Sequence, residues 1–465
     1  KAGIKKMIKI TAAELAKILS GKLENLSADT VIDQYPVINS ANAKSGTFFV
    51  AFEGVNVDGH SFAEDAIKSG TKFALVSKPV SAPSVVVADV SQALLTLAEF
   101  VRGRLSEMKV IGITGSQGKT TTKEFLYSIL KSVGECVATE ANFNTEIGVP
   151  LTLLRCKEST KFCIIEMGAR HLGDIAKLTK VSSPDVGIVL AVGSAHIGEF
   201  GSIEAIAKTK SELITNLSAG KSAVLGSYDS WTPKMATDLP LEVINFGESA
   251  MVRAADIQLP GGYAHFELVT PNGRNPVSLQ LLGEHQIPNA LGAAAAAFAL
   301  GINNEVIALG LTTADLGSKW RMQIEELNGL KIINDYYNAN PESMKAALKT
   351  LVLLSQENGG SSWAILGKMH ELGAIEEEAH RQIAMYCEEI GVDHLLSVGT
   401  DLYKLSKNES NLKNMVVHHC PNTDAVLELV SNFSHGDVVL LKASRSEKFE
   451  DLADLITNKW NGGQA

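Results

Sequence analysis

The sequence contains little of what marks a secreted, membrane-spanning or nucleic-acid-binding protein. Only five of its 465 residues are cysteines, and they are scattered without a CxxC pair: Cys136, Cys156, Cys163, Cys387 and Cys420. An odd number at irregular spacing argues against a disulfide framework or a cysteine zinc site. We therefore expect ordinary thiols in a reducing cytoplasm.

Long hydrophobic runs and clusters of positive charge are also missing. No stretch of about 18 apolar residues is present to span a membrane. The basic segment Lys1 to Lys9 is not followed by the apolar core of a signal peptide, and we expect a native start at Met7. The formal net charge is −10 and no basic stripe is present, so neither a nucleic acid partner nor membrane insertion is expected. We interpret the acidity as a solubility feature.

Length and composition indicate a folded protein of several domains. At roughly 150 residues per domain, 465 residues suggest about three domains. Hydrophobic residues make up 45% of the chain and charged residues 20%, so it can bury real cores. The predicted fold class is α/β. We expect a small mixed N-terminal domain over residues 1–104, a central P-loop domain with a mainly parallel sheet over 105–314, and a Rossmann-like doubly wound domain over 315–465.

From Lys109 onward, unbroken apolar runs alternate with helical patterns. Lys109–Thr114, Phe162–Ile165 and Val186–Val192 are predicted strands, and a helix is expected over Thr120–Val133. Continuous apolar strands between helices are typical of a parallel sheet covered on both faces. Because ligands collect beyond the carboxyl ends of such strands, residues with chemical function are expected there.

The remaining regions have their own patterns. In the N-terminal region we predict helices over Thr11–Ser20 and Val90–Arg104 and strands over Thr47–Phe52 and Phe73–Val76. Met251–Leu282 is expected to be antiparallel, with turns at Pro260–Gly262 and Pro271–Gly273. An alanine-rich helix over Asn289–Leu300 and a hinge over Gly310–Gly317 follow. In the C-terminal region we predict strands over Leu330–Ile333, Trp363–Leu366, His394–Val398 and Val438–Leu441, and helices over Pro341–Leu354 and Ile375–Ile390.

The strongest single motif is a glycine-rich loop between a predicted strand and a predicted helix. It runs Gly112-Ile-Thr-Gly-Ser-Gln-Gly-Lys-Thr-Thr121, with Ile113 where the strict P-loop pattern has glycine. Its glycines let backbone N–H groups turn toward phosphate oxygens, and the helix N-terminus adds a favourable dipole. Lys119 can reach the outer phosphates and Thr120 can offer its hydroxyl to Mg²⁺. The loop predicts nucleoside triphosphate binding, against the alternative of an ordinary strand–turn–helix.

Charged and polar residues follow the next two strands of the same sheet. Glu166 closes one apolar strand and suits Mg²⁺, which takes oxygen ligands. His196 follows the next strand, and Lys208 and Lys210 lie on a predicted helix beyond it. Singly, the glutamate is a possible helix cap, the histidine a structural residue, and the lysines a solvated face. Their joint placement favours a functional site.

Several segments together resemble the Mur ligase family of peptidoglycan precursor synthesis, from end to end of the chain. They are Thr114–Thr121, similar to T-G-x-x-G-K-T-[TS]; Asn142–Leu154, similar to N-x-N-x-x-I-G-x-P; and Gly283–Ala290, similar to G-x-H-x-x-x-N-A. Asp335–Met344 resembles the D-x-Y-N-A-N-P-x-S-M segment of the members that add D-alanyl-D-alanine. Glu371–Gly373, Lys442–Ser446, Gly46–Gly54 and Asp58–His60 resemble further segments of those members. The D-N-P-R signature of the diaminopimelate-adding members is absent.

The resemblance implies an activity and a set of roles. ATP would phosphorylate the terminal carboxylate of UDP-N-acetylmuramoyl-tripeptide, and D-alanyl-D-alanine would attack the acyl phosphate, in a monomer with ATP and two Mg²⁺ ions. The implied catalytic residues are Lys119, Glu166, His196 and Lys210, and Lys210 matches a lysine that is carbamylated in the family. The implied metal ligands are Thr120, Glu166, His196 and carbamylated Lys210. ATP contacts are implied for Gly115, Ser116, Gln117, Gly118, Lys119, Thr120, Thr121, Asn289, Arg321, Asp335, Asn338 and Asn340. Contacts with the other substrates are implied for Ser40, Asp58, Gly59, His60, Asn142, Asn144, Thr145, Ser444 and Arg445.

The sequence departs from the pattern of those members at five positions. Asn39 and Ala41 flank Ser40 where D-S-R is usual, Ala191 replaces an asparagine, and Lys368 and His370 replace an aspartate and an apolar residue.

Three alternatives stay open at this stage. A sister ligase would add a single amino acid to a muramoyl precursor or glutamate to folate. A P-loop switch or motor would hydrolyse ATP without ligation, and a degenerate binding protein would bind ATP without turnover. A substrate panel, with and without an amine acceptor, separates these classes.

Overall fold

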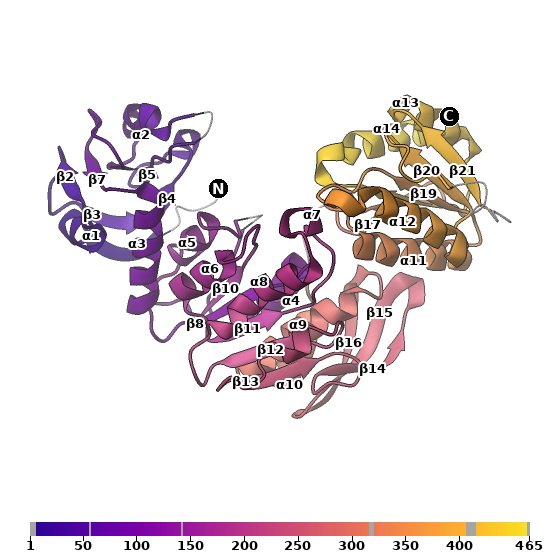
Figure 1. Cartoon of the computed structure of the whole chain (residues 1–465), viewed down its shortest axis with the longest axis horizontal. Coiled ribbons are helices and arrows are strands. Elements are labelled where there is room, and N and C mark those ends of the chain that lie inside the picture. The colour runs from indigo at the N-terminus through magenta and orange to yellow at the C-terminus, as the bar shows by residue number, and fades with distance from the viewer. Residues whose placement is uncertain (1–5, 55–56, 141–142, 316–319, 406–414, 463–465) are drawn as a thin grey trace.

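The computed structural model of this chain describes residues 6–54, 57–140, 143–315, 320–405 and 415–462. It confirms the predicted α/β class: parallel sheets covered by helices form the middle and the end of the chain, preceded by a smaller mixed region. Figure 1 shows the N-terminal and C-terminal regions above opposite ends of the central region. Within the described residues, no helix is long and apolar enough to cross a membrane.

The N-terminal region is a small mixed α/β unit. Its main sheet has the order β2-β7-β6-β5-β4, with strands Lys22–Glu24, Ser84–Val86, Ala74–Val76, Phe48–Val50 and Pro36–Val37. A second, two-stranded sheet pairs β1 (Lys6–Thr11) with β3 (Val31–Gln34). Helix α1 (Ala12–Leu19) begins at a capping box between Thr11 and Glu14, which satisfies the first N–H groups of the helix. Helix α2 (Ala63–Lys68) packs against the short 3-10 segment Gly59–Phe62.

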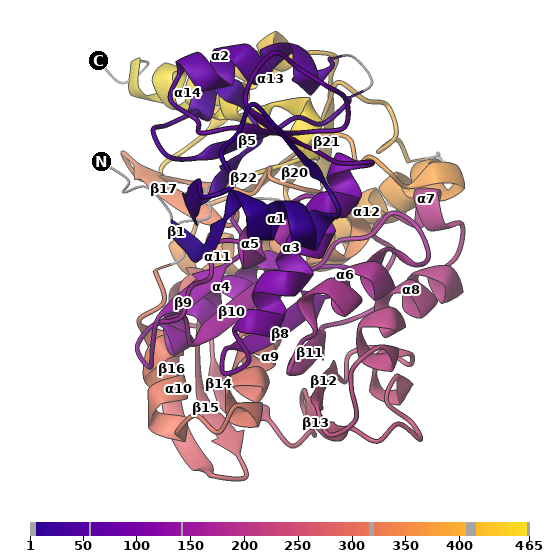
Figure 2. The ribbon, with the colours of Figure 1, turned by 90° about the vertical axis from the view of Figure 1, so that its left-hand side faces the viewer.

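The N-terminal region is docked firmly on the central one through helix α3 (Val90–Arg104), seen between them in Figure 2. This helix packs against α5 (Gly148–Leu153) and α6 (Asp174–Ser182) of the central region. Near its end, Arg102 Nη2 lies 3.1 Å from Asp185 Oδ2, and both side chains are largely buried. One apolar core includes residues of both regions, so the packing marks no boundary between them. The proposed domain boundary between residues 104 and 105 therefore stays a prediction.

The central sheet is parallel throughout and has the order β13-β12-β11-β8-β10-β9. Its strands are Glu242–Phe246, Ser222–Gly226, Val186–Val189, Lys109–Thr114, Phe162–Glu166 and Cys136–Ala138. Helices α5, α6 and α8 (Ile203–Thr215) cover one face, and α4 (Lys119–Leu130), α9 (Gln286–Ala299) and α10 (Asn304–Thr312) cover the other. Burial on both faces explains why the inner strands are continuously apolar, as predicted. This order places the ends of β8, β10 and β11 side by side.

An antiparallel sheet of β14 (Arg253–Gln258), β15 (Tyr263–Thr270) and β16 (Gly273–Leu282) extends the central region, as predicted. The expected hinge over Gly310–Gly317 is wrong where it begins, because Gly310 lies inside α10. A Cβ atom at Gly310 would lie 2.6 Å from Ile129 Cα, so this glycine permits close packing of α10 on α4. Residues 316 and 317, at the end of the expected hinge, lie outside the described residues.

The C-terminal region is a second doubly wound unit. Its sheet has the order β17-β18-β22-β19-β20-β21, in which only the edge strand β17 is antiparallel. The strands are Gln323–Leu327, Leu330–Asn334, Val438–Lys442, Ser362–Leu366, His394–Val398 and Val416–Cys420. Helices α11 (Pro341–Asn358) and α12 (Glu376–Ile390) cover one face, and α13 (Thr423–Leu429) and α14 (Phe449–Gly462) cover the other.

The packing of Gly310 generates a stability prediction. Gly310→Ala should lower the free energy of unfolding by about 1–3 kcal/mol, because the new methyl group meets the backbone of α4 and forces the helices apart. Gly103→Ala is the matched control, since Gly103 is also helical but an added Cβ meets no atom within 4 Å. That variant should gain about 0.5–1 kcal/mol of helix propensity. Urea and thermal denaturation would measure both, and equal effects of the two changes would contradict this account.

Candidate active site

A cavity of about 440 Å³ lies where the carboxyl edge of the central sheet faces the C-terminal region. The P-loop residues Ser116–Thr121 line it together with Asn144, Glu166, His196, Asn289, Arg321, Asp335, Asn338, Asn340 and Lys442. A larger cavity of about 670 Å³ opens beside edge strand β9 and lies apart from these groups. Most of its cations are already ion-paired, as Lys123 is with Glu124, Arg155 with Glu140 and Lys157 with Glu135. The smaller cavity is therefore the candidate site.

The P-loop has the predicted context between β8 and α4. Gly118 is in the left-handed conformation with φ of 80°, and an added Cβ there would collide with Asn289 Oδ1. Glycine at position 118 thus allows the loop to turn, and it leaves room for Asn289 of α9 to lie against the loop. Lys119 Nζ donates a hydrogen bond to Gly115 O at 2.8 Å. Burial is the main cause that lowers the pKa of Lys119, with Glu166 opposing it.

Glu166, at the end of β10, is buried and held by neighbours from three elements. Thr120 Oγ1 donates to its Oε2 at 3.0 Å, and Asn144 Nδ2 donates to its Oε1 at 3.1 Å. The backbone N–H of Glu166 donates to Thr139 Oγ1 at 3.0 Å. A carboxylate fixed next to the first hydroxyl of the P-loop helix is suited to a hard cation that is shared with phosphate oxygens.

Lys210 is a buried cation, whereas its neighbour Lys208 on the same helix is exposed. Within the described residues no hydrogen bond or ion pair involves the Lys210 ammonium group. Burial, and then the nearby Lys119, lower the pKa of Lys210 to about 7. A lysine that is partly neutral near pH 7 can react with CO₂ to form a carbamate. Lys210 does not line the cavity itself, but its charge acts on His196 and the charge of Lys119 acts on it, so it lies close to both.

His196 follows β11 in a left-handed backbone conformation, with φ of 64°. Its Nδ1 atom lies 2.6 Å from Glu371 Oε2 of the C-terminal region. Burial lowers the pKa of His196, and Glu371 opposes that shift. A non-glycine residue in this conformation is held there by its surroundings, as is common at functional sites.

The far end of the cavity combines amides with an apolar wall. Asn289 Nδ2 donates to Gln286 Oε1 at 3.0 Å, and Gln286 Nε2 lies 2.9 Å from His285 Nε2. Burial lowers the pKa of His285 to about 4, so its ring is neutral at pH 7. The wall consists of Leu190, Tyr228, Phe246 and Pro288. Apolar and aromatic side chains next to amides suit a purine base. This wall could not be found from the sequence because its residues are far apart in the chain.

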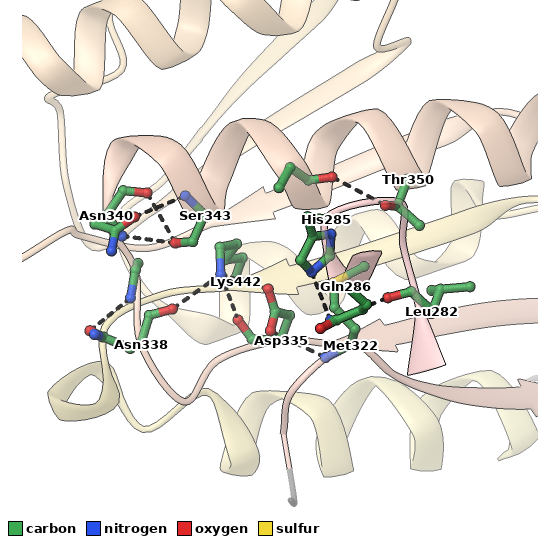
Figure 3. Close-up of polar contacts among 12 residues, drawn as sticks. Leu282, His285, Gln286, Met322, Asp335, Asn338, Asn340, Ser343, Thr350 and Lys442 are labelled. Atoms are coloured by element: carbon green, nitrogen blue, oxygen red, sulfur yellow. Dashed lines mark hydrogen bonds and ion pairs between the residues drawn. The ribbon is translucent and has the colours of Figure 1, made fainter. Parts of the chain in front are cut away.

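Lys442 is the main residue that the sequence analysis missed. It ends β22, is almost fully buried, and its Nζ donates to Asp335 Oδ2 at 2.6 Å and to Asn338 O at 3.1 Å. Asp335 Oδ1 in turn accepts from Met322 N at 3.2 Å. Figure 3 shows Lys442 between Asn338 and Asp335, with dashed lines from its ammonium group to both residues. A lone lysine at the end of the apolar run Val438–Leu441 was the signal that could have identified it.

The other predicted nucleotide residues of the C-terminal region are present at the cavity but partly engaged. Asn340 Oδ1 accepts from Ser343 N and caps α11, and Asn338 Oδ1 accepts from Ala339 N. The guanidinium group of Arg321 stacks 4.2 Å from the centroid of the Tyr337 ring. These side chains therefore shape the 335–340 loop as well as lining the cavity. Figure 3 shows Asn338 and Asn340 among them.

The residues predicted to contact the other substrates are dispersed. Ser40, Asp58, Gly59 and His60 lie in the N-terminal region, Thr145 is exposed beside Asn144, and Asn142 lies outside the described residues. His60 is buried, with Nδ1 2.6 Å from Asp58 Oδ1 and Nε2 accepting from Ser77 N at 3.0 Å. Because both ring nitrogens are engaged, His60 supports this turn from within.

Ser444 and Arg445 lie beyond β22, next to the C-terminal side of the site. Ser444 is buried and its Oγ accepts from His370 N at 3.0 Å. Arg445 is exposed, pairs with Glu450 and stacks on Trp320 at 4.4 Å. Neither lines the cavity.

The departures from the family pattern are accommodated locally. Asn39 Oδ1 accepts from Ala41 N at 2.9 Å and caps a 3-10 turn. Lys368 pairs with Glu376 at 3.0 Å, and His370 Nε2 lies 2.5 Å from Glu447 Oε1. Ala191 contributes its backbone carbonyl to the P-loop residue Ser116 at 2.9 Å.

Comparison with known proteins decides the family. The chain matches the Mur ligase family catalytic domain over residues 37–104, the Mur ligase middle domain over 113–297 and the Mur ligase glutamate ligase domain over 320–445. It is 33% identical to the UDP-N-acetylmuramoyl-tripeptide–D-alanyl-D-alanine ligase of Mycobacterium tuberculosis, over 97% of this chain and 98% of that protein. The chain belongs to the Mur ligase family.

Solved structures agree with this assignment of the Mur ligase fold. MurF from Acinetobacter baumannii superposes with a TM-score of 0.88 at 32% identity, covering 97% of this chain and 99% of that one. The MurF ligase of Thermotoga maritima, solved in complex with ADP, has a TM-score of 0.81 at 29% identity over 93% of this chain and 98% of that one. The three-domain organisation expected from the sequence is confirmed by these likenesses.

The residues of this Mur ligase suit a metal ion that is bound together with a phosphate group. They do not form a complete set of protein ligands in advance. Within the described residues, no group of three or more His, Cys, Asp or Glu side chains could hold a metal ion by itself. Mg²⁺ usually takes one or two carboxylates and completes its shell with water and substrate phosphates. Glu166 fits that pattern, because its buried carboxylate lies next to the Thr120 hydroxyl and accepts a hydrogen bond from it at 3.0 Å.

The buried Lys442–Asp335 pair generates a prediction. Lys442→Met should lower the free energy of unfolding by about 3–5 kcal/mol, because it leaves Asp335 charged and uncompensated. Adding Asp335→Asn to that variant should restore part of the loss. Lys404→Met is a matched control, since Lys404 also lies 2.6 Å from an aspartate, Asp401, but both side chains are exposed. That control should leave stability unchanged in urea denaturation; a similar loss in both lysine variants would contradict the burial argument.

Proposed function

We propose that this Mur ligase joins D-alanyl-D-alanine to UDP-N-acetylmuramoyl-tripeptide, using ATP and an acyl phosphate intermediate. The observation that carries the proposal is one cavity lined both by the P-loop and by the Asp335–Asn340 loop of the C-terminal region. The second loop belongs to the segment that resembles the D-alanyl-D-alanine-adding members. A relative of that name, 33% identical, matches 97% of the chain and supports the same substrate pair.

The proposed reaction has two steps. A carboxylate oxygen of the tripeptide attacks the γ-phosphorus of ATP, the bond to the β-γ bridging oxygen breaks, and ADP leaves. The amine of D-alanyl-D-alanine then attacks the acyl carbon, the C–O bond to phosphate breaks, and the amine loses a proton as the amide forms. Little covalent chemistry falls to the protein, so positioning and charge neutralisation are its contribution.

This chain's own residues have distinct tasks in those steps. Lys119 binds the β- and γ-phosphates, and the backbone N–H groups of Gly115–Thr121 surround them. Asn289 and the wall around Tyr228 bind the adenine, with Arg321, Asp335 and the loop to Asn340 closing that side. The resemblance assigns Asn142, Asn144 and Thr145 to the muramoyl peptide. Ser40 and the Asp58–His60 turn belong to the proposed UDP-sugar site, and Ser444 and Arg445 to the dipeptide side.

Thr120, Glu166 and His196 would hold one Mg²⁺ ion, and carbamylated Lys210 would help to hold a second. When bound, these ions would neutralise phosphate charge. Excluding water protects an acyl phosphate, and the C-terminal region over the cavity is suited to that task. The resemblance to the family supports a monomer, and the nucleotide substrates support a cytoplasmic location.

Three other classes of function remain as outcomes of the test. A sister ligase would accept a single amino acid, and an ATPase would turn over without an acceptor. A degenerate binding protein would bind ATP without turnover. The Asp335–Met344 segment and the full-length relatives favour the dipeptide ligase.

The deciding experiment measures phosphate release from ATP and Mg²⁺ with UDP-N-acetylmuramoyl-tripeptide, with and without D-alanyl-D-alanine. Release should require both substrates and give a pentapeptide product by mass. Lys119→Ala should reduce the rate by at least about 100-fold, because a preorganised charge on the transferred phosphoryl group is lost, while circular dichroism stays unchanged. Turnover without an acceptor, or near-normal activity of Lys119→Ala, would overturn the proposal.

Carbamylation of Lys210 makes a separate prediction. Depleting CO₂ should lower ligase activity and bicarbonate should restore it, because the carbamate oxygens derive from CO₂. With ¹³CO₂, the wild-type protein should give a carbamate signal in ¹³C NMR that Lys210→Ala lacks. Lys208→Ala is the matched control on the exposed side of the same helix and should keep both signal and activity. A signal that persists in Lys210→Ala would assign the carbamate to another lysine.

A further inference from the structure

The loop between β11 and α7 (Ile197–Phe200) is fastened to the P-loop on one side. Gly193 N donates to Ser116 Oγ at 2.8 Å, and Ser116 Oγ donates back to Gly193 O at 3.1 Å. Ser116 N donates to Ala191 O at 2.9 Å. The side chain and the backbone of one P-loop residue therefore both depend on where residues 191–193 lie.

The other side of the same loop is fastened to the C-terminal region by Glu342. Its Oε1 accepts from Ser194 N at 2.9 Å, and its Oε2 accepts from Ser194 Oγ at 3.0 Å. Glu342 lies in the first turn of α11, directly after Asn340 and Pro341. A carboxylate in that position is favoured by the helix dipole, and hydrogen bonds to a charged acceptor are roughly twice as strong as neutral ones.

Space at the contact is limited. A Cβ atom at Gly193 would lie 3.1 Å from Glu342 Oε1, so glycine allows the carboxylate to approach the loop backbone. A few residues on, Gly198 N donates to Glu371 O at 3.1 Å, and a Cβ at Gly198 would lie 2.6 Å from Gly373 N. The loop thus meets the C-terminal region at two places, and in Figure 1 α7 lies directly beside that region.

We infer that Glu342 is a positioning residue that transmits docking of the C-terminal region to the P-loop, through Ser194, Gly193 and Ser116. When the C-terminal region docks, the Glu342 carboxylate accepts hydrogen bonds from Ser194 and so fixes the neighbouring Gly193. The hydrogen bonds of Gly193 then hold the Ser116 side chain in the P-loop. Withdrawal of α11 removes the acceptor from Ser194 and releases that chain of contacts. The P-loop is then fully ordered only when the region that carries the Asp335–Asn340 loop is in place. The inference rests on the proposed function, because it assigns this contact a part in the phosphoryl step.

The test compares Glu342→Ala with Glu342→Gln and with Glu357→Ala. Glutamine keeps an acceptor for Ser194 N–H, and the Ser194 hydroxyl can reverse to accept from its amide group, so this variant should keep most of the activity. In Glu342→Ala, kcat for pentapeptide formation should fall about 10- to 100-fold, the usual effect of losing a charged hydrogen-bond acceptor, with little change in KM for ATP. Glu357 lies exposed at the other end of α11, so its alanine variant should match the wild type.

Hydrogen exchange gives a readout that is independent of turnover. Glu342→Ala should exchange faster over residues 191–198 than the wild type, with thermal stability and the rest of the chain unchanged. The effects of Glu342→Ala and Ser116→Ala on kcat should be less than additive, because both break one chain of contacts.

The outcomes separate the two proposals. If the wild type makes pentapeptide and Glu342→Ala equals Glu357→Ala, the positioning role is wrong while the ligase function stands. Loss of activity in Glu342→Gln equal to that in Glu342→Ala, without faster exchange in the loop, would also overturn the coupling. If the wild type makes no pentapeptide, the proposed function is wrong. Hydrogen exchange over residues 191–198 still shows in that case whether Glu342 holds the loop.

Discussion

Positive charge is gathered at the carboxyl edge of the central sheet with little to neutralise it. Lys210 is buried and Lys119 is half-buried at the cavity, and burial is the main cause that lowers the pKa of each. The carboxylate of Glu166 is close, yet it already accepts hydrogen bonds from Thr120 and Asn144. Charges interact strongly where water is excluded, and burying like charges near each other raises the free energy of the folded protein. A bound polyanion such as a triphosphate lowers that free energy by neutralising them. The strand order that brings β8, β10 and β11 together is what creates this situation.

The C-terminal region meets that edge with a different kind of stabilisation. Its buried cation, Lys442, is paired with Asp335 and with backbone oxygen atoms, so it shapes the site without adding unbalanced charge. The 335–340 loop is further fixed by the cap that Asn340 provides to α11. Arg321 is a second cation of this region that lines the cavity, where it stacks on Tyr337. The central region thus contributes Lys119 and Lys210 to the positive charge of the site, and the C-terminal region contributes Arg321 and fixed walls.

Most of the fold could be predicted from the sequence, because buried parallel strands leave unbroken apolar runs such as Lys109–Thr114. The P-loop and Glu166 could be predicted as well, since their positions at strand ends follow from local pattern. Glycine was less informative: Gly310 was expected in a hinge, but a glycine that permits helix packing has the same appearance in a sequence. Lys442 and the Tyr228–Phe246 wall needed the structure, because their function arises from contacts between segments far apart in the chain. The pairing of Ser194 with Glu342 is of the same kind, since the motif around Glu342 does not reveal that its side chain meets a loop 148 residues earlier in the chain.

The approach of Gly198 to Gly373 is a contact between two stretches of backbone with no side chain between them. Substitution can change the attraction between side chains gradually. A contact between two backbones instead sets the shortest distance to which the two segments can approach. It fixes how near α7 and the 371–373 turn can come, whatever ligand draws them together. A single methyl group added at either glycine would meet the backbone of the other, so it would hold α7 and the C-terminal region apart.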